Sequence, residues 1–98
     1  MFKITVTSTR PNTDVAFFSR SNELNTLMTS LQVAGKCLEE TRSTSNNGLT
    51  FVYQSFWNSE NDYNEYRDLE IVSNYNSSKD TYNNTNQIIS SITKEHLP

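Results

Sequence analysis

The most constraining feature of this sequence is the segment 51–67, FVYQSFWNSENDYNEYR, in which a strand pattern changes into a helix pattern within two residues. The β-branched and aromatic residues up to Trp57 are typical of a strand. Ser59, followed three residues later by Asp62, resembles a capping box with Asp in place of the usual Glu or Gln. The acidic residues of this first turn also suit the helix dipole. The segment therefore predicts a strand followed at once by a helix.

Three further strands are predicted from residue alternation and turn signals. Residues 2–9, FKITVTST, alternate apolar and polar side chains, as a strand with one buried face does. Residues 37–44 precede the turn sequence Asn46-Asn47-Gly48, and residues 49–56, which belong to the aromatic strand already predicted, follow it. This arrangement favours a β-hairpin. Residues 87–93, QIISSIT, are rich in β-branched residues and predict the last strand.

Two helices separate these strands. After a cap at Ser21 or Asn22, the first helix has apolar residues at positions i, i+3, i+4 and i+7, and it ends near Gly35: these are Leu24, Leu27, Met28 and Leu31. The second helix begins after Ser59 and is expected to kink near Asp68. Its second half, residues 74–86, NYNSSKDTYNNTN, has low helix propensity and is expected to be broken or frayed.

This β-α-β-β-α-β order predicts an α+β, ferredoxin-like plait in a single domain spanning residues 1–98, an antiparallel sheet with helices on one face. We expect the core to include Leu27 and Leu31 with Ile4 and Val6. The other sheet face would leave mixed apolar area in water, so a second copy is expected to cover it in a sheet-to-sheet homodimer. The residues expected on that face are Thr5, Thr7, Tyr53 or Phe51, and the isoleucines of the last strand.

Composition excludes several classes of function. A net charge of −3 without a basic run argues against a nucleic-acid partner, and also against reading the aromatic third strand as an RNA-recognition surface. No apolar segment of signal or membrane length is present, and the single cysteine cannot form an intramolecular disulfide, so we expect a cytoplasmic protein without a membrane partner. With two glycines and no metal-ligand spacing, we expect no phosphate loop, no metal and no cofactor.

The individual reactive residues point to no catalytic group. His96 lies two residues from the end and is expected to be a solvated tail residue, and Cys37 is expected to be a small buried hydrophobe. Glu39 and Glu40 should point to opposite faces of a strand. The acidic residues in the first turns of the second helix are interpreted as caps and a solvated helix face: Glu60, Asp62 and Glu65.

The aromatic third strand that ends in Trp57, followed by an acidic capped helix, resembles the dimeric α+β barrel superfamily. The resemblance covers the whole chain in element order and implies ferredoxin-like subunits that pair through their sheets and enclose a cavity. In the monooxygenase-like branch, a His that lines the pocket commonly follows the Trp by nine residues. Here that position is Tyr66, so the Trp is carried over to Trp57 but a haem-ligand or His-assisted role is not.

Two hypotheses about function follow. The first is a noncatalytic accessory or small-ligand-holding dimer, whose ligand would be a small hydrophobic molecule. The alternative is a cofactor-independent, monooxygenase-like enzyme acting on a small hydrophobic or aromatic substrate. In the first, the aromatic residues are expected to belong mostly to the core and the interface. In the second, the candidate pocket is lined by Tyr53, Trp57 and Tyr66, with Arg42 or Asn58 available to polarise a substrate carbonyl group.

Overall fold

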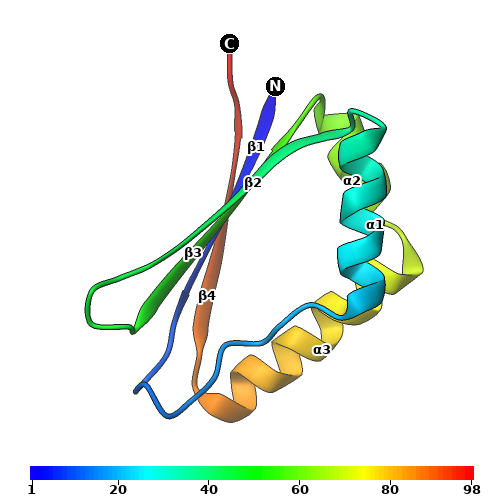
Figure 1. The fold of residues 1–98 in the computed structure, drawn as a ribbon. Helices are drawn as coiled ribbons and strands as arrows, with labels where there is room; N and C mark the ends of the chain where they lie inside the picture. Colours follow the sequence, from blue (N-terminus) through cyan, green and yellow to red (C-terminus); the bar gives the residue numbers. More distant parts are fainter.

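The computed structural model describes residues 1–98, and it contains four strands and three helices (Figure 1). Their bounds in chain order are β1 Phe2–Thr9, α1 Asn22–Val33, β2 Cys37–Thr44, β3 Thr50–Trp57, α2 Glu60–Arg67, α3 Glu70–Asn86 and β4 Ile89–His96. The predicted element order is confirmed, with the second helix divided into α2 and α3. None of the helices is long and apolar enough to cross a membrane.

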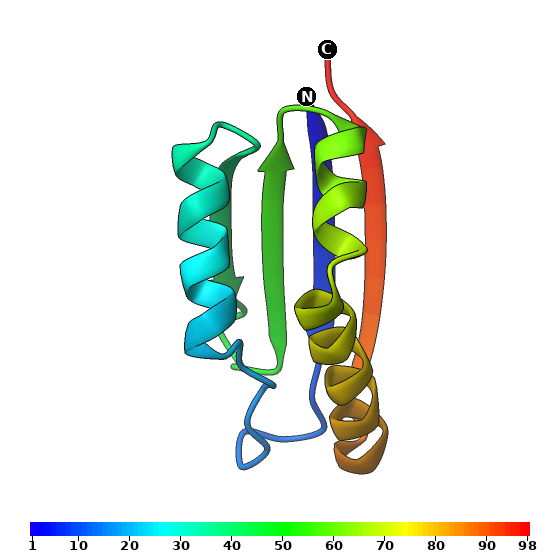
Figure 2. The ribbon, with the colours of Figure 1, turned by 90° about the vertical axis from the view of Figure 1, so that its right-hand side faces the viewer.

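The strands form one antiparallel sheet in the order β2-β3-β1-β4. All three helices lie on one face of this sheet, with α1 over the β2 side and α2 and α3 over β1 and β4 (Figure 2). The predicted ferredoxin-like α+β fold is therefore confirmed. The hairpin between β2 and β3 turns at Gly48, whose φ of 76° suits glycine, and its N–H donates to the carbonyl of Ser45.

Serine residues begin the first two helices, as the sequence predicts. The N–H of Leu24 donates to Ser21 Oγ over 3.3 Å, and the N–H of Asp62 donates to Ser59 Oγ over 3.1 Å. Helix α2 ends at Arg67, in agreement with the predicted kink near Asp68.

Helix α3 corrects the prediction of a broken or frayed segment, because it runs without interruption for 17 residues. Tertiary contacts compensate for its low intrinsic propensity. The ring of Phe18 lies 5.5 Å from that of Tyr75 and 5.3 Å from that of Tyr82, and the Tyr82 hydroxyl donates to the carbonyl of Ala16. The loop before α1 thus packs along α3 and holds it helical.

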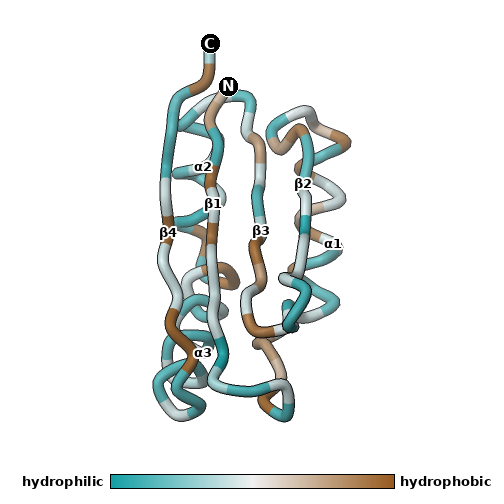
Figure 3. The backbone as a smooth tube through the Cα atoms, turned by 90° about the vertical axis from the view of Figure 1, so that its left-hand side faces the viewer, coloured by the Kyte–Doolittle hydropathy of each residue, from teal (hydrophilic) through white to brown (hydrophobic).

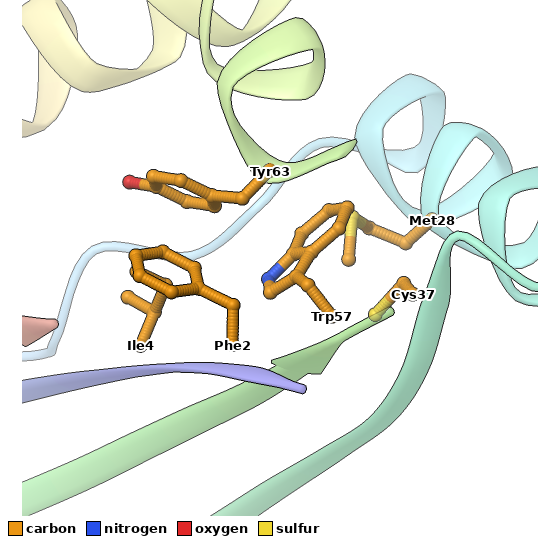
Figure 4. Packing of buried hydrophobic residues seen from close by; sticks show 6 residues of the cluster. All are labelled: Phe2, Ile4, Met28, Cys37, Trp57 and Tyr63. Atoms are coloured by element: carbon orange, nitrogen blue, oxygen red, sulfur yellow. The ribbon is translucent and has the colours of Figure 1, made fainter. Parts of the chain in front are cut away.

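The hydrophobic core lies at the end of the sheet where β1 begins and β3 ends (Figure 4). It contains Phe2, Ile4, Met28, Cys37, Trp57 and Tyr63. Of the four residues expected in the core, Ile4 is buried, whereas Val6, Leu27 and Leu31 are only half-buried. On α1 the buried positions are Leu24 and Met28, because the helix turns this part of its apolar stripe toward the sheet.

The sheet register corrects the expected placement of Phe51 and Tyr53. Residues directly opposite in an antiparallel pair share a face. Tyr53 is opposite Val6 and Phe51 is opposite Ser8, on the side that the helices cover. Ile92 is also opposite Val6 and lies on this face, so of the isoleucines in β4 only Ile89 belongs to the other one.

The uncovered face, which we call the open face, carries Thr5 and Thr7 as expected, together with Val52, Gln54 and Phe56 of β3. Seen from this side, the four strands lie in front of the helices, and short hydrophobic segments are separated by hydrophilic and intermediate ones (Figure 3). The homodimer through this face stays a prediction.

Candidate functional site

A cavity of about 860 Å³ lies between the sheet and the helices. Its floor comes from the four strands, with Arg42 and Thr44 as the contribution of β2, and its walls come from the loop before α1, the first turn of α1, and α2 and α3. We call it the helix-side cavity. It adjoins the core, which occupies only one end of the sheet, so the rest of the covered face is left partly unfilled.

Aromatic side chains from four parts of the chain line this cavity. They are Phe17 and Phe18 in the loop, Phe51 and Tyr53 on β3, Tyr63 and Tyr66 on α2, and Tyr75 on α3. The loop is fastened by Arg10, which donates from Nε to the carbonyl of Gly48 and from Nη1 to that of Val15, each over 2.8 Å. The Arg10 guanidinium also lies 4.5 Å from the centroid of the Phe17 ring.

A hydrogen-bonded network centred on Glu40 lies beside the aromatic lining. Arg20 Nη1 is 2.6 Å from Glu40 Oε2, and the Tyr53 hydroxyl donates to the same oxygen. Arg42 Nη2 lies 3.5 Å from Glu40 Oε2, and Gln32 Nε2 lies 3.3 Å from Oε1. This network, which we call the Glu40 network, joins β2 to β3, to α1 and to the loop that precedes α1.

The Glu40 network sets the charges of its members. Burial alone would raise the pKa of Glu40, but hydrogen bonds from Arg20 and Tyr53 and the charges of Arg20 and Arg42 hold that pKa below its ordinary value. Burial would lower the pKa of Arg20, yet its hydrogen bond to Glu40 and neighbouring charges raise it. Burial and the hydrogen bond to Glu40 raise the pKa of Tyr53. At neutral pH the network is thus a carboxylate held by a guanidinium and a neutral phenol.

Of the side chains proposed from the sequence, the structure brings Tyr53, Tyr66 and Arg42 together in the cavity lining. Trp57 lies in the core instead, with 0% of its surface exposed, and its Nε1 donates to Ser55 Oγ over 2.9 Å. Trp57 packs against the lining residue Tyr66, since the centroids of the two rings are 4.9 Å apart. Asn58 is exposed outside the lining, with its backbone N–H bonded to the carbonyl of Lys36.

Several residues in or beside the lining are not predicted as site residues from the sequence. Glu40, beside the lining, is expected only to face away from Glu39, but the face that it shares with Arg42 could have placed it under the helices. Arg20, Tyr75 and Lys79 carry no comparable signal, because their positions depend on how the loop and α3 pack. Burial lowers the pKa of Lys79, against the opposing effect of Asp80.

Histidine and cysteine lie away from the cavity lining. His96 is exposed, as expected of a solvated residue, but it belongs to β4 and not to a frayed tail: it pairs with Phe2, and its ring lies 4.9 Å from that of Phe2. Cys37 is buried in the core as expected, and burial raises its pKa to about 11. The structure contains no group of three or more His, Cys, Asp or Glu side chains placed to hold a metal ion.

No protein-family model matches the chain, and no curated protein matches its sequence. Two solved structures share its fold. One is a proposed antibiotic biosynthesis monooxygenase from Deinococcus radiodurans, at 15% identity and a TM-score of 0.62, covering 100% of this chain and 93% of that one. The other is Rv0793 from Mycobacterium tuberculosis, at 14% identity and a TM-score of 0.61, covering 100% of this chain and 96% of that one. They confirm the ferredoxin-like, monooxygenase-like fold that the sequence predicts.

Proposed function

We propose that this chain is a noncatalytic binding module that holds a small hydrophobic or aromatic molecule in the helix-side cavity. One observation carries the proposal, a cavity of about 860 Å³ above a sheet floor, whose lining includes a set of aromatic side chains from the loop before α1, β3, α2 and α3. Ligand sites are typically clefts of roughly 300 to 1,000 Å³ with apolar walls and a few polar groups. The Glu40 network supplies polar groups whose positions are already fixed by their mutual hydrogen bonds.

The protonation states beside the cavity favour holding a molecule over transforming it. A general acid or base works best when its pKa is near the operating pH. Burial raises the pKa of Tyr66 to about 12, the pKa of Tyr53 is also raised, and that of Glu40 is lowered. These three groups therefore keep one protonation state near neutrality. Lys79 is the lining residue whose pKa moves toward neutral pH, and it is the group to test for the enzyme alternative.

The proposal is tested by titration with N-phenyl-1-naphthylamine, a neutral aromatic dye that fluoresces in apolar surroundings. We expect the wild type to bind the dye at one site per chain, and Val6→Trp to abolish binding by filling the cavity floor. Thr7→Trp is the matched control, since the next residue of the strand points to the open face. Absence of dye binding, or binding that survives Val6→Trp, would contradict the proposal.

Recovery of the compound distinguishes a binding module from an enzyme. After incubation in air with the wild type, we expect chromatography to return 1-naphthol, a small oxidisable aromatic, unchanged. Oxidation that requires the folded protein and is lost in Lys79→Met would instead support the monooxygenase-like alternative.

We further propose that two chains associate through their open faces. Val52, Phe56 and Ile89 place apolar area on this face among threonine and glutamine side chains. A copy of the same face would cover this area in a twofold arrangement.

A further inference from the structure

The helix-side cavity has a charge opposite to that of the chain as a whole. The chain carries a net charge of −3. The cavity lining nevertheless contains one carboxylate, that of Asp80, against the cationic side chains of Arg20, Arg42, Arg67, Lys79 and Lys94. A concentration of cations inside an acidic protein favours an anionic occupant.

Ion pairs neutralise some of these cations but leave others available. Glu40 pairs with Arg20 at 2.6 Å, and Asp68 pairs with Arg67 at 3.1 Å. Lys79 and Lys94 have no carboxylate within 4.0 Å, although Lys94 Nζ lies 5.5 Å from the centroid of the Tyr63 ring. Arg42 has one ion pair, at 3.5 Å to Glu40, which Arg20 already engages more closely, and its guanidinium lies 5.1 Å from the centroid of the Tyr53 ring. Most of the Arg42 guanidinium donors are therefore free.

Two phenol groups add neutral donors to the same cavity. Tyr66 and Tyr75 both line the cavity, and neither hydroxyl bonds to another protein group, whereas the hydroxyl of Tyr53 is committed to Glu40. Buried tyrosine hydroxyls usually have a partner. Arg42 lines the same cavity from β2, while Tyr66 comes from α2 and Tyr75 from α3. These two hydroxyls and Arg42 are thus donors available to one occupant of the cavity.

We infer that the helix-side cavity selects aromatic carboxylates, with the carboxylate bound by Arg42 and the hydroxyls of Tyr66 and Tyr75. The aromatic body of such a compound packs against the apolar lining, which includes Val6, Phe17 and Phe51. Repulsion from Glu40 is limited, because that carboxylate already accepts from Arg20 and Tyr53 and only 9% of its side chain is exposed. This inference rests on the proposed function, since it names the class of molecule that the cavity holds.

The experiment compares 2-naphthoate with its neutral methyl ester, each used to displace N-phenyl-1-naphthylamine at pH 7. The two compounds share the aromatic body and differ in charge. A charge-assisted hydrogen bond that the ester cannot form predicts about tenfold or tighter binding of the acid. Raising the salt concentration should narrow this difference, because Arg42 is half-exposed to solvent.

Variants then assign the preference to particular side chains. Arg42→Gln should remove the preference for the acid while leaving ester binding unchanged, and Tyr66→Phe should weaken acid binding by a few-fold. Arg67→Gln is the matched control: it removes a charge from the same lining, but one that Asp68 already neutralises, and acid binding should stay within about twofold. Circular dichroism checks that each variant is folded.

The outcomes separate this inference from the proposed function. Equal affinity for acid and ester, tighter binding of the ester, or a preference that survives Arg42→Gln would overturn the carboxylate subsite and leave the binding module standing. Failure of the dye, the acid and the ester alike to bind would overturn both.

Discussion

Glu40 shows how a residue with an ordinary sequence context acquires a specific role through packing. It is contacted by Arg20, Gln32, Arg42 and Tyr53, which come from the loop, α1, β2 and β3. Its neighbour Glu39 faces the other side of the sheet and is exposed. A comparison of the two glutamates therefore measures what the Glu40 network contributes to the free energy of unfolding, with Glu39 as the matched surface charge.

Replacement of Glu40 should change how stability depends on pH. The pKa of Glu40 lies below its ordinary value of 4.5, so its stabilising effect is full above about that pH and is lost as the pH falls through the lowered folded-state pKa. Near neutral pH we expect Glu40→Gln to lower the free energy of unfolding by about 2 kcal/mol. The difference from wild type should shrink under acid conditions. Urea denaturation across the acid range measures it.

Glu39→Gln provides the control for this experiment. Its side chain has no ion pair, so its free energy of unfolding should follow that of wild type across the acid range. A constant gap between Glu40→Gln and wild type at every pH would show that the lowered pKa of Glu40 makes no contribution.

Trp57 is a second residue whose role can be measured directly. Its ring fills the core beneath Tyr66, so Trp57→Ala should lower the free energy of unfolding by about 3 to 5 kcal/mol. Tyr66→Phe keeps the ring and removes a hydroxyl without a protein partner, so its stability should remain close to that of wild type. Thermal or urea unfolding of both variants compares them, and a cost below about 1 kcal/mol for Trp57→Ala would contradict the packing role.

At the scale of elements, the structure distinguishes positions that helical periodicity treats alike. Leu24 and Leu27 both belong to the apolar stripe of α1, but Leu24 is 1% exposed and Leu27 is half-buried. Leu24→Ala should therefore cost about 2 to 5 kcal/mol in unfolding free energy, and Leu27→Ala distinctly less. Urea denaturation of the two single variants tests the order, and a larger cost for Leu27→Ala would mean that α1 presents another face to the sheet.

The element boundaries were largely predictable, because local chemistry determines them. Ser21 and Ser59 bond to the first turns of their helices, and Gly48 forms the hairpin turn. The length of α3 was not predictable from propensity, since contacts of Tyr75 and Tyr82 with the distant Phe18 sustain it. Alternation along β3 showed which residues share a face, but it could not show which face the helices cover.

At the scale of the whole molecule, the topology followed from the order of elements, whereas the site depended on pairs of residues far apart in sequence. Tyr53, Tyr66 and Arg42 were proposed as pocket residues on a local pattern, and all three lie in the cavity lining. Arg20 precedes Glu40 by 20 residues, and no spacing rule links a loop residue to a strand residue at that separation. The sequence alone therefore does not predict the Glu40 network, which the folded structure reveals.

Association through the open face gives a prediction at this scale. We expect light scattering at micromolar concentration to report a mass near twice 11.3 kDa, because a standard interface of roughly 1,600 Å² could cover the face. Val52→Glu should shift the equilibrium toward the monomer by placing a charge on that face. Val33→Glu, on an exposed position of α1, should leave the mass unchanged. A monomeric wild type at all concentrations would refute the dimer.

Strand β3 is shared between the helix-side cavity and the open face, and this has a consequence for the genetics of the protein. Phe51 and Tyr53 line the cavity, while Val52 and Gln54 lie on the opposite surface. A saturation mutagenesis of this strand can be scored separately for dye retention and for self-association. Substitutions at one position should impair dye retention, and substitutions at the next position should impair self-association, in alternation along the strand.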